Sequence, residues 1–288
     1  MLKAVKSILK FILLYILMTA VIITSLVFYI RFDDKTIDVT NYEIYSQKLP
    51  PSFEGYKIML LSDYHDAYYY EKVADKIKKS HPDVIFLLGD MCNNGDKGTA
   101  NTEKLLGLIQ NTAPIYGITG NHEEYATKVQ SLLDKFRKYN VKYLLGESAE
   151  LTKGNSSILV YGLRDTYLSD QEIENDPNWL KNNMDALSKN LNTNRFNILL
   201  MHRASLFPEI TSYGYDAVFS GHMHGGIIRL PFVGGLVSES GTRFFPEYTK
   251  GLYTKGSTKM VVSRGLDYDK SRVRIFNGPE LVLVTLRK

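Results

Sequence analysis

The sequence contains very little cysteine. Cys92 is the only cysteine in 288 residues, so the chain can form no internal disulfide and holds no cysteine-based zinc site. Any metal ion bound by the protein is therefore held by His, Asp, Glu or Asn. A single thiol does not identify the compartment, because exported proteins can lack disulfides.

The chain also lacks a broad excess of charge. It has 35 Lys and Arg against 31 Asp and Glu, and three of the lysines stand in an N-terminal segment without acids. The remainder is nearly neutral, which argues against the extended basic surface of nucleic-acid-binding proteins, and we expect no nucleic-acid partner. A hydrophobic fraction of 44% is that of a globular protein with a sizeable core.

Residues 11–30 (FILLYILMTAVIITSLVFYI) carry no charge. A helix of that length spans about 30 Å, the thickness of the hydrocarbon core of a bilayer. A cleaved signal peptide is the alternative, but its apolar region usually has about 7 to 15 residues and an A-x-A-like site follows it. We therefore predict a retained single-pass membrane anchor over 1–31, a connecting segment with a first strand over 32–55, and a main domain over 56–288.

The charges that flank this run predict its orientation. Before the run stand Lys3, Lys6 and Lys10, and after it stand Arg31, Asp33, Asp34, Lys35 and Asp38. Basic residues favour the cytoplasmic side. We expect the N-terminus in the cytoplasm and the main domain outside the cell membrane.

Short apolar runs alternate with helical patterns from residue 56 onward. Runs typical of buried strands lie at 57–62, 84–88, 115–119, 158–161, 197–201 and 217–220. Amphipathic helix patterns lie at 70–79, 101–109, 123–139 and 173–191. This alternation predicts an α/β body with parallel strand pairing. Residues 221–288 are rich in glycine, with strand patterns at 259–263 and 281–286, and predict a second, largely antiparallel sheet.

Polar residues follow five of the predicted strands. They are Asp63, His65 and Asp66; Asp90; Asn121, His122 and Glu123; His202 and Arg203; and His222 and His224. Ligands bind at the carboxyl ends of parallel strands, so these side chains are expected at one rim. Five of the six histidines fall there, with His81 the exception, which makes unrelated structural roles for all of them improbable. Neighbouring glycines fit tight turns and close backbone approach.

Imidazole, carboxylate and amide ligands without thiolate suit divalent Mn, Fe or Zn. Asp63, His65, Asp90, Asn121, His202, His222 and His224 together exceed what one ion needs. Two ions about 3.5 to 4 Å apart, bridged by one carboxylate and a water, would use all seven and activate the water against a phosphoryl group.

The motifs DYH, GD, GNHE, a histidine after the fifth strand and GHMHGG, in this order over about 56–226, resemble the calcineurin-like metallophosphoesterase superfamily. The tail, with LPFVGG, GLY, SRGL and NGPELVLVTL, is similar to a branch of exported or membrane-anchored bacterial phosphoesterases that includes lipid-precursor pyrophosphatases. The resemblance implies a four-layer α/β/β/α sandwich of two mixed sheets, with a metallophosphoesterase domain over 56–288.

The resemblance also implies roles for the rim residues. One metal ion would be held by Asp63, His65 and His224, the other by Asn121, His202 and His222, with Asp90 bridging. His122 would protonate the leaving oxygen or stabilise charge on the phosphoryl group. In much of the family an acid three residues after the bridging Asp orients this histidine, but here that residue is Asn93. Asp66 and Glu123 are the candidate substitutes.

The implied activity is dinuclear, metal-dependent hydrolysis of phosphoester or pyrophosphate bonds. The phosphorylated substrate is expected to be membrane-associated or lipid-linked, because aromatic residues at 68–70 and apolar residues at 227–236 adjoin the motifs; core packing of both segments is the alternative. Arg203 fits either a phosphate contact or a surface salt bridge. Two other functions stay open: a phosphatase or phosphodiesterase of soluble nucleotides, and a non-catalytic metal-binding scaffold.

Overall fold

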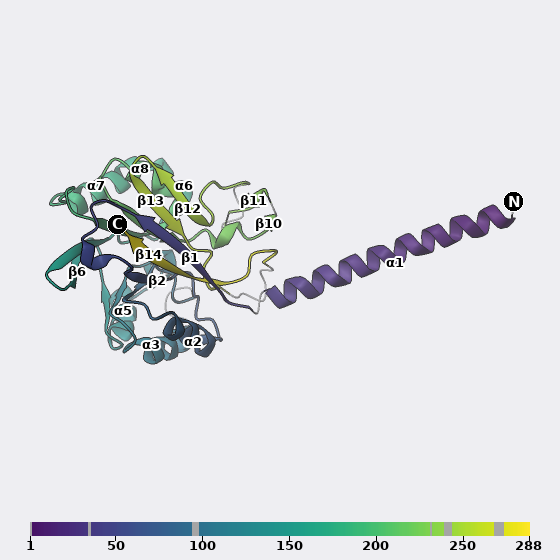
Figure 1. The fold of residues 1–288 in the computed structure, drawn as a ribbon, viewed down its shortest axis with the longest axis horizontal. Helices are drawn as coiled ribbons and strands as arrows, with labels where there is room; N and C mark the ends of the chain where they lie inside the picture. The colour runs from purple at the N-terminus through teal and green to yellow at the C-terminus, as the bar shows by residue number, and fades with distance from the viewer. Residues whose placement is uncertain (1, 34–35, 94–97, 231, 239–243, 268–273) are drawn as a thin grey trace.

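The computed structural model describes residues 2–33, 36–93, 98–230, 232–238, 244–267 and 274–288. Helix α1 (Leu2–Asp33) extends away from an α/β body (Figure 1). Its segment Lys3–Ser25 is long and apolar enough to cross a membrane, and the body buries none of it. Asp34 and Lys35, which contribute to the predicted orientation, and Pro231 of the LPFVGG motif lie outside the described residues.

The body contains two six-stranded sheets. The first has the order β1 (Asp38–Tyr45), β14 (Glu280–Arg287), β2 (Lys57–Leu61), β3 (Val84–Leu87), β4 (Ile115–Gly117) and β5 (Val141–Tyr143). The second has the order β12 (Gly251–Lys255), β13 (Thr258–Val262), β9 (Ala217–Gly221), β8 (Asn197–Arg203), β7 (Ser156–Gly162) and β6 (Glu147–Lys153). A short hairpin, β10 (Arg229–Leu230) and β11 (Gly234–Gly235), lies apart from both.

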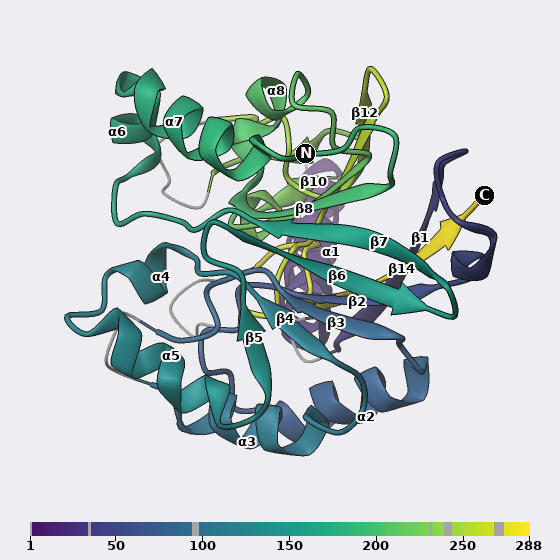
Figure 2. The same cartoon turned by 90° about the vertical axis from the view of Figure 1, so that its left-hand side faces the viewer.

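Helices cover the outer face of each sheet (Figure 2). On the first sheet lie α2 (Tyr70–Ser80), α3 (Ala100–Ile109) and α5 (Val129–Arg137). On the second lie α6 (Asp170–Asn175), α7 (Pro177–Ser188) and α8 (Phe207–Ile210). The short α4 (Asn121–Glu124) and the 3-10 turns η1 (Pro51–Phe53), η2 (Ala204–Leu206) and η3 (His224–Gly226) complete the elements.

Three apolar cores fill the spaces between these four layers, and strand alternation explains them. In β2, Ile58 and Leu60 enter the core between the sheets, whereas Met59 and Leu61 pack with α2, α3 and α5. In β8, Ile198 and Leu200 face the first sheet, whereas Leu199 and Met201 face the outer helices. Because side chains alternate along a strand, a strand that is apolar on both faces joins two cores. The predicted four-layer sandwich of two mixed sheets, preceded by one apolar helix, is confirmed.

The two predicted helices at 123–139 and 173–191 are each divided in the structure. The first becomes α4 and α5. The second breaks at Asp176, whose side chain accepts a hydrogen bond from Asn178 N and begins α7, with Pro177 as its first residue. Proline fits the first helical turn but not a helix interior, so the break follows from local chemistry.

The prediction of a largely antiparallel second sheet in the last third of the chain is wrong. Strands β7, β8, β9 and β13 pair in parallel, and only β6 and β12 at the two edges are antiparallel. Strand β14 joins the first sheet, between β1 and β2. The six predicted strands are therefore shared between two sheets, whose carboxyl ends meet at the polar rim.

Candidate metal centre

The carboxyl ends of β2, β3 and β4 from one sheet and of β8 and β9 from the other converge on the predicted rim. The seven predicted metal ligands are all buried, with at most 9% of each residue exposed. Two groups of these side chains lie close enough for each to hold a metal ion. One contains Asp63, His65, Asp90 and His224, and the other contains Asp90, His202 and His222. Asp90 belongs to both groups.

The ligand atoms approach one another closely. Asp90 Oδ2 lies 3.2 Å from His202 Nε2 and 3.7 Å from His65 Nε2. His224 Nε2 lies 3.5 Å from Asp63 Oδ1. Atoms that bind one metal ion lie about this far from one another, because zinc, for example, binds protein nitrogen and oxygen atoms at about 2.0 to 2.2 Å.

Unusual backbone conformations aim these side chains at the rim. Asp63, His65, Asp90, His222 and His224 have φ between 46° and 68°. Asp and His adopt this left-handed region more readily than most residues, yet each such residue costs about 1 kcal/mol or more, and such strain clusters at functional sites. The predicted close approach at glycine also holds, because a Cβ at Gly120 would overlap the Asp90 carboxylate.

Several polar atoms that face the rim are buried without a hydrogen-bond partner. Within the described part of the chain they include His65 Nε2, Asn121 Oδ1, His202 Nε2 and His222 Nδ1. An unsatisfied buried polar atom costs about 1 to 3 kcal/mol. The four atoms belong to four predicted ligands, and each offers a lone pair when its side chain is neutral. Cations bound among them would satisfy all four atoms together. The residues therefore fit divalent metal ions.

The charge at the rim leads to the same conclusion. Burial alone would lower the pKa of His202, but the adjacent Asp90 carboxylate raises it above the ordinary value. Burial opposes ionisation of Asp90, whereas His202 and His65 hold its pKa well below the usual range. The carboxylates thus attract positive charge to the position of His202 Nε2. A divalent cation meets this demand and displaces the proton.

Two histidines are held from behind by fixed acceptors. His202 Nδ1 lies 2.7 Å from the Leu88 carbonyl oxygen; since a carbonyl only accepts, Nδ1 carries the proton and donates it. His222 Nε2 lies 3.2 Å from Asp170 Oδ1 and donates in the same way. In the tautomer that donates this hydrogen bond, each ring directs the lone pair of its other nitrogen to the rim. Such partners orient metal-binding histidines and make them more basic.

The sequence does not predict the involvement of Asp170, at the first turn of α6. Ser169 caps this helix and forms a capping box with Glu172, and that pattern in the sequence could have located the helix start. Asp170 also pairs with Arg203, which donates to Asp165 Oδ1 at 2.9 Å and to the Leu168 carbonyl at 2.7 Å. Arg203 is 3% exposed, so it forms a buried ion pair, not the surface salt bridge considered from the sequence.

His122 is only partly buried, at the edge of the rim. Its ring lies edge-on to His65 with ring centres 4.5 Å apart, and its backbone N–H donates to Asp90 Oδ1 at 2.9 Å.

Asn93 is exposed. Glu123 accepts hydrogen bonds from the backbone N–H of Asp90, Met91, Cys92 and Gly120, and Asp66 accepts from Asn101 N and Thr102 N. Both acids thus order the loops around the rim through the main chain.

Comparison with known proteins identifies relatives. The family model described as calcineurin-like phosphoesterase matches residues 56–226. A metallophosphoesterase of Bacillus subtilis strain 168, YkuE, is 30% identical over 261 residues, covering 87% of this chain and 86% of that protein. A Danio rerio protein named transmembrane protein with metallophosphoesterase domain is 25% identical, covering 88% of this chain and 57% of its own length.

Among solved structures, the phosphopantetheinyl hydrolase of Mycobacterium tuberculosis aligns with a TM-score of 0.48 and 12% identity, covering 73% of this chain and 89% of that one. The family match spans all five motifs at the rim and the strands that carry them. The chain belongs to the calcineurin-like phosphoesterase family and is a metal-dependent phosphoester hydrolase.

Proposed function

We propose that the protein hydrolyses phosphoester or pyrophosphate bonds with two divalent ions. One ion is held by Asp63, His65 and His224, the other by Asn121, His202 and His222, and Asp90 bridges them. The observation that carries this assignment is the membership of Asp90 in both ligand groups, with His222 in one and His224 in the other. Borderline ligands without thiolate favour Mn, Fe or Zn.

The chemistry divides between the ions and His122. When bound, the ions make a water nucleophilic at neutral pH and polarise the phosphoryl oxygen. His122 donates a proton to the leaving oxygen. Its partial exposure leaves the ring accessible to a substrate, while its N–H bond to Asp90 and its contact with His65 hold it beside the ligands. The backbone around the proposed bridging residue is ordered by Glu123, which limits reorganisation during the reaction.

We further propose that residues 1–31 anchor the protein as a single-pass membrane protein, with the domain over 56–288 outside the cytoplasm. The apolar helix α1 and a zebrafish relative named as a transmembrane protein support this. An anchored site favours a membrane-associated or lipid-linked phosphorylated substrate. Exposed Leu230 and Val233, shortly after His224, support an apolar approach to the site.

The test uses the full chain in proteoliposomes, loaded in turn with Mn, Fe and Zn. Metal content is measured by mass spectrometry, and hydrolysis is followed on a lipid-linked pyrophosphate, an aryl phosphodiester and free nucleotides. We expect two ions per chain and the highest kcat/KM on the lipid-linked substrate. A preference for free nucleotides would replace the lipid proposal with a soluble nucleotide phosphatase. A single ion at saturation would contradict the dinuclear assignment.

A further inference from the structure

Exposed apolar side chains gather around the β10–β11 hairpin. Phe232 is 109% exposed relative to its reference state, Val233 57% and Leu230 40%. Phe244 and Phe245, in the segment bonded to this hairpin through Leu236 and Val237, are 73% and 66% exposed. We call these five residues the hairpin patch. Single exposed apolar residues are ordinary, whereas a contiguous group marks a contact surface.

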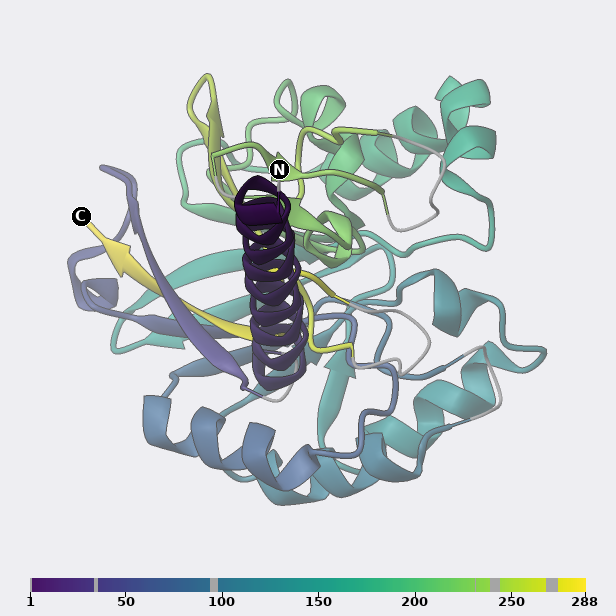
Figure 3. The ribbon, with the colours of Figure 1, turned by 90° about the vertical axis from the view of Figure 1, so that its right-hand side faces the viewer.

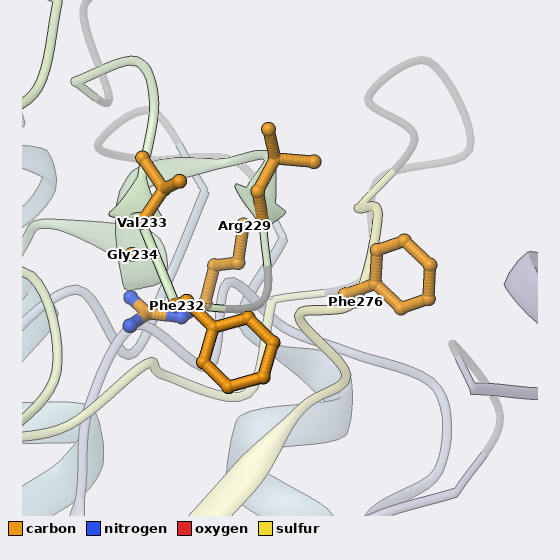
Figure 4. A pocket seen from close by; sticks show the side chains of 6 residues that line it. Arg229, Phe232, Val233, Gly234 and Phe276 are labelled. Atoms are coloured by element: carbon orange, nitrogen blue, oxygen red, sulfur yellow. The ribbon is translucent and has the colours of Figure 1, made fainter.

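The hairpin patch borders an open recess. The recess has a volume of about 560 Å³ and is lined by Arg229, Leu230, Phe232, Val233, Gly234 and Phe276. Figure 4 shows Phe232 on the hairpin and Phe276 on a neighbouring segment, both beside this recess. The apolar lining of the recess therefore continues from the hairpin patch onto Phe276, which is distant in the sequence.

The hairpin patch lies where the chain enters the body from α1. Asp38 N, at the start of β1, donates to the Pro279 carbonyl at 2.9 Å, and Arg229 N donates to the Ile275 carbonyl at 2.9 Å. The segment 275–279 thus connects the start of β1 with the hairpin. An extended chain covers at most about 3.5 Å per residue, so the step from Asp33 to Asp38 reaches no further than about 18 Å. Figure 1 shows α1 leaving the body on the side of β10 and β11, and Figure 3 shows the body from that side, with α1 toward the viewer.

We propose that the hairpin patch is a second membrane contact, which enters the interface of the bilayer that α1 crosses. This inference rests on the proposed anchoring by α1. Apolar and aromatic side chains of interfacial elements enter the boundary between headgroups and acyl chains to a depth of about 5 to 10 Å. Phe232 and Val233 at the hairpin turn have the chemistry and exposure for that depth.

The contact has a consequence for the metal centre. The hairpin follows η3, which contains His224, with only Ile227 and Ile228 between them. Arg229 Nη1 donates to the Gly225 carbonyl at 2.7 Å, so hairpin and metal loop are held together. A hairpin seated in the interface places the rim at the membrane surface, within reach of a phosphate carried by a lipid and without extraction of the acyl chains.

The depth of single tryptophans tests the proposal in the full chain. Trp179, the only tryptophan, is changed to Phe, and the variants Phe232→Trp, Tyr15→Trp and Tyr45→Trp are reconstituted in phosphatidylcholine vesicles with brominated acyl chains. Tyr15 lies within the apolar segment of α1. Tyr45 is the matched exposed control, because it ends β1 and stands about 23 Å along the strand from Asp38.

We expect bromines near the headgroup to reduce the emission of Phe232→Trp about twofold or more, because an interfacial segment lies at that depth. Bromines deep in the acyl chains should quench Tyr15→Trp, because a spanning segment reaches the middle of the bilayer. Tyr45→Trp emission stays unchanged. If Tyr15→Trp is quenched but Phe232→Trp behaves like Tyr45→Trp, the hairpin contact is wrong and the anchor stands. A blue shift of Phe232→Trp emission that grows with protein density, without quenching, would identify a contact between copies of the chain. That result would also contradict the membrane contact of the hairpin and leave the anchor standing. If Tyr15→Trp is not quenched, the anchor and the hairpin contact both fail.

Discussion

The two halves of the proposed metal centre differ in the groups that stand behind His202, His222 and His224. Behind His202 and His222 stand single acceptors, the Leu88 carbonyl at 2.7 Å and Asp170 at 3.2 Å. Behind His224, Nδ1 lies 3.3 Å from Arg274 Nη2 and 3.5 Å from Asp267 Oδ2. The Arg274 guanidinium and the Asp267 carboxylate therefore compete for His224 Nδ1. Behind His202 and His222, in contrast, the ring nitrogen that faces away from the rim has an acceptor alone.

Because these supports differ, we expect the two proposed ions to be bound unequally. A carbonyl or carboxylate behind the ring selects the tautomer that binds metal and strengthens the ligand. Burial, the neighbouring His65 and the Arg274 guanidinium all lower the pKa of His224, which makes its ring a weaker base. We expect the half with His202 and His222 to bind its ion more tightly and to lose it last during chelation.

Asp90→Asn is expected to have the largest effect, because Asp90 belongs to both halves. Losing the shared carboxylate weakens both ions, and kcat/KM on an aryl phosphodiester should fall at least about a thousandfold. Metal content is measured alongside the rate. Asp75→Asn, on the exposed surface of α2, is the control and should retain full activity. Metal-dependent activity of Asp90→Asn within tenfold of the unchanged protein would falsify the bridging role.

His222→Ala and His224→Ala separate the two halves. Each should remove one ion and lower turnover about a hundredfold, since one Lewis acid remains. The ion left in His224→Ala should resist chelation longer than the ion left in His222→Ala. Mass spectrometry after timed dialysis against a chelator measures this order. Loss of the same ion from both variants would mean that the two histidines share one metal.

Asp170→Asn tests the support behind His222. Removing the charged acceptor should weaken one metal ion by about ten- to a hundredfold, with a smaller change in the other. The metal dissociation constants come from competition with a chromogenic chelator, and the melting temperature is recorded for each sample. Asp170→Glu should recover part of the affinity. A fall in melting temperature with unchanged metal affinity would assign Asp170 a purely structural role with Arg203.

Asp267→Asn is the matched change behind His224 and should have the smallest effect. Arg274 already competes with this carboxylate for His224 Nδ1. We therefore expect a loss of only about threefold in metal affinity, which is less than the loss of a partner without such a competitor causes. The same chelator competition applies. An effect as large as that of Asp170→Asn would show that both halves are supported alike and would remove the proposed asymmetry.

Much of the body follows from local patterns. The six apolar runs correspond to β2, β3, β4, β7, β8 and β9, and the polar residues after five of them meet at one rim. The asymmetry behind the histidines was not predictable, because Asp170 and His222 are 52 positions apart in the chain and no local pattern connects them. Tyr69 illustrates the same limit: it is buried and donates to the Leu266 carbonyl, whereas the adjacent Tyr68 is 56% exposed.

Local sequence alone identifies the apolar N-terminal helix, the strand ends that carry the predicted ligands, and the family. These depend on hydrophobic period and on short motifs, which are properties of neighbouring residues. Tertiary structure decided that the strands divide between two sheets, that β13 pairs in parallel with β9, and which carboxylate stands behind each histidine. It also connected the hairpin with the start of β1 through the segment 275–279. The physical reason is that strand pairing and buried ion pairs are selected by contacts between distant segments, whose free energies no local pattern encodes.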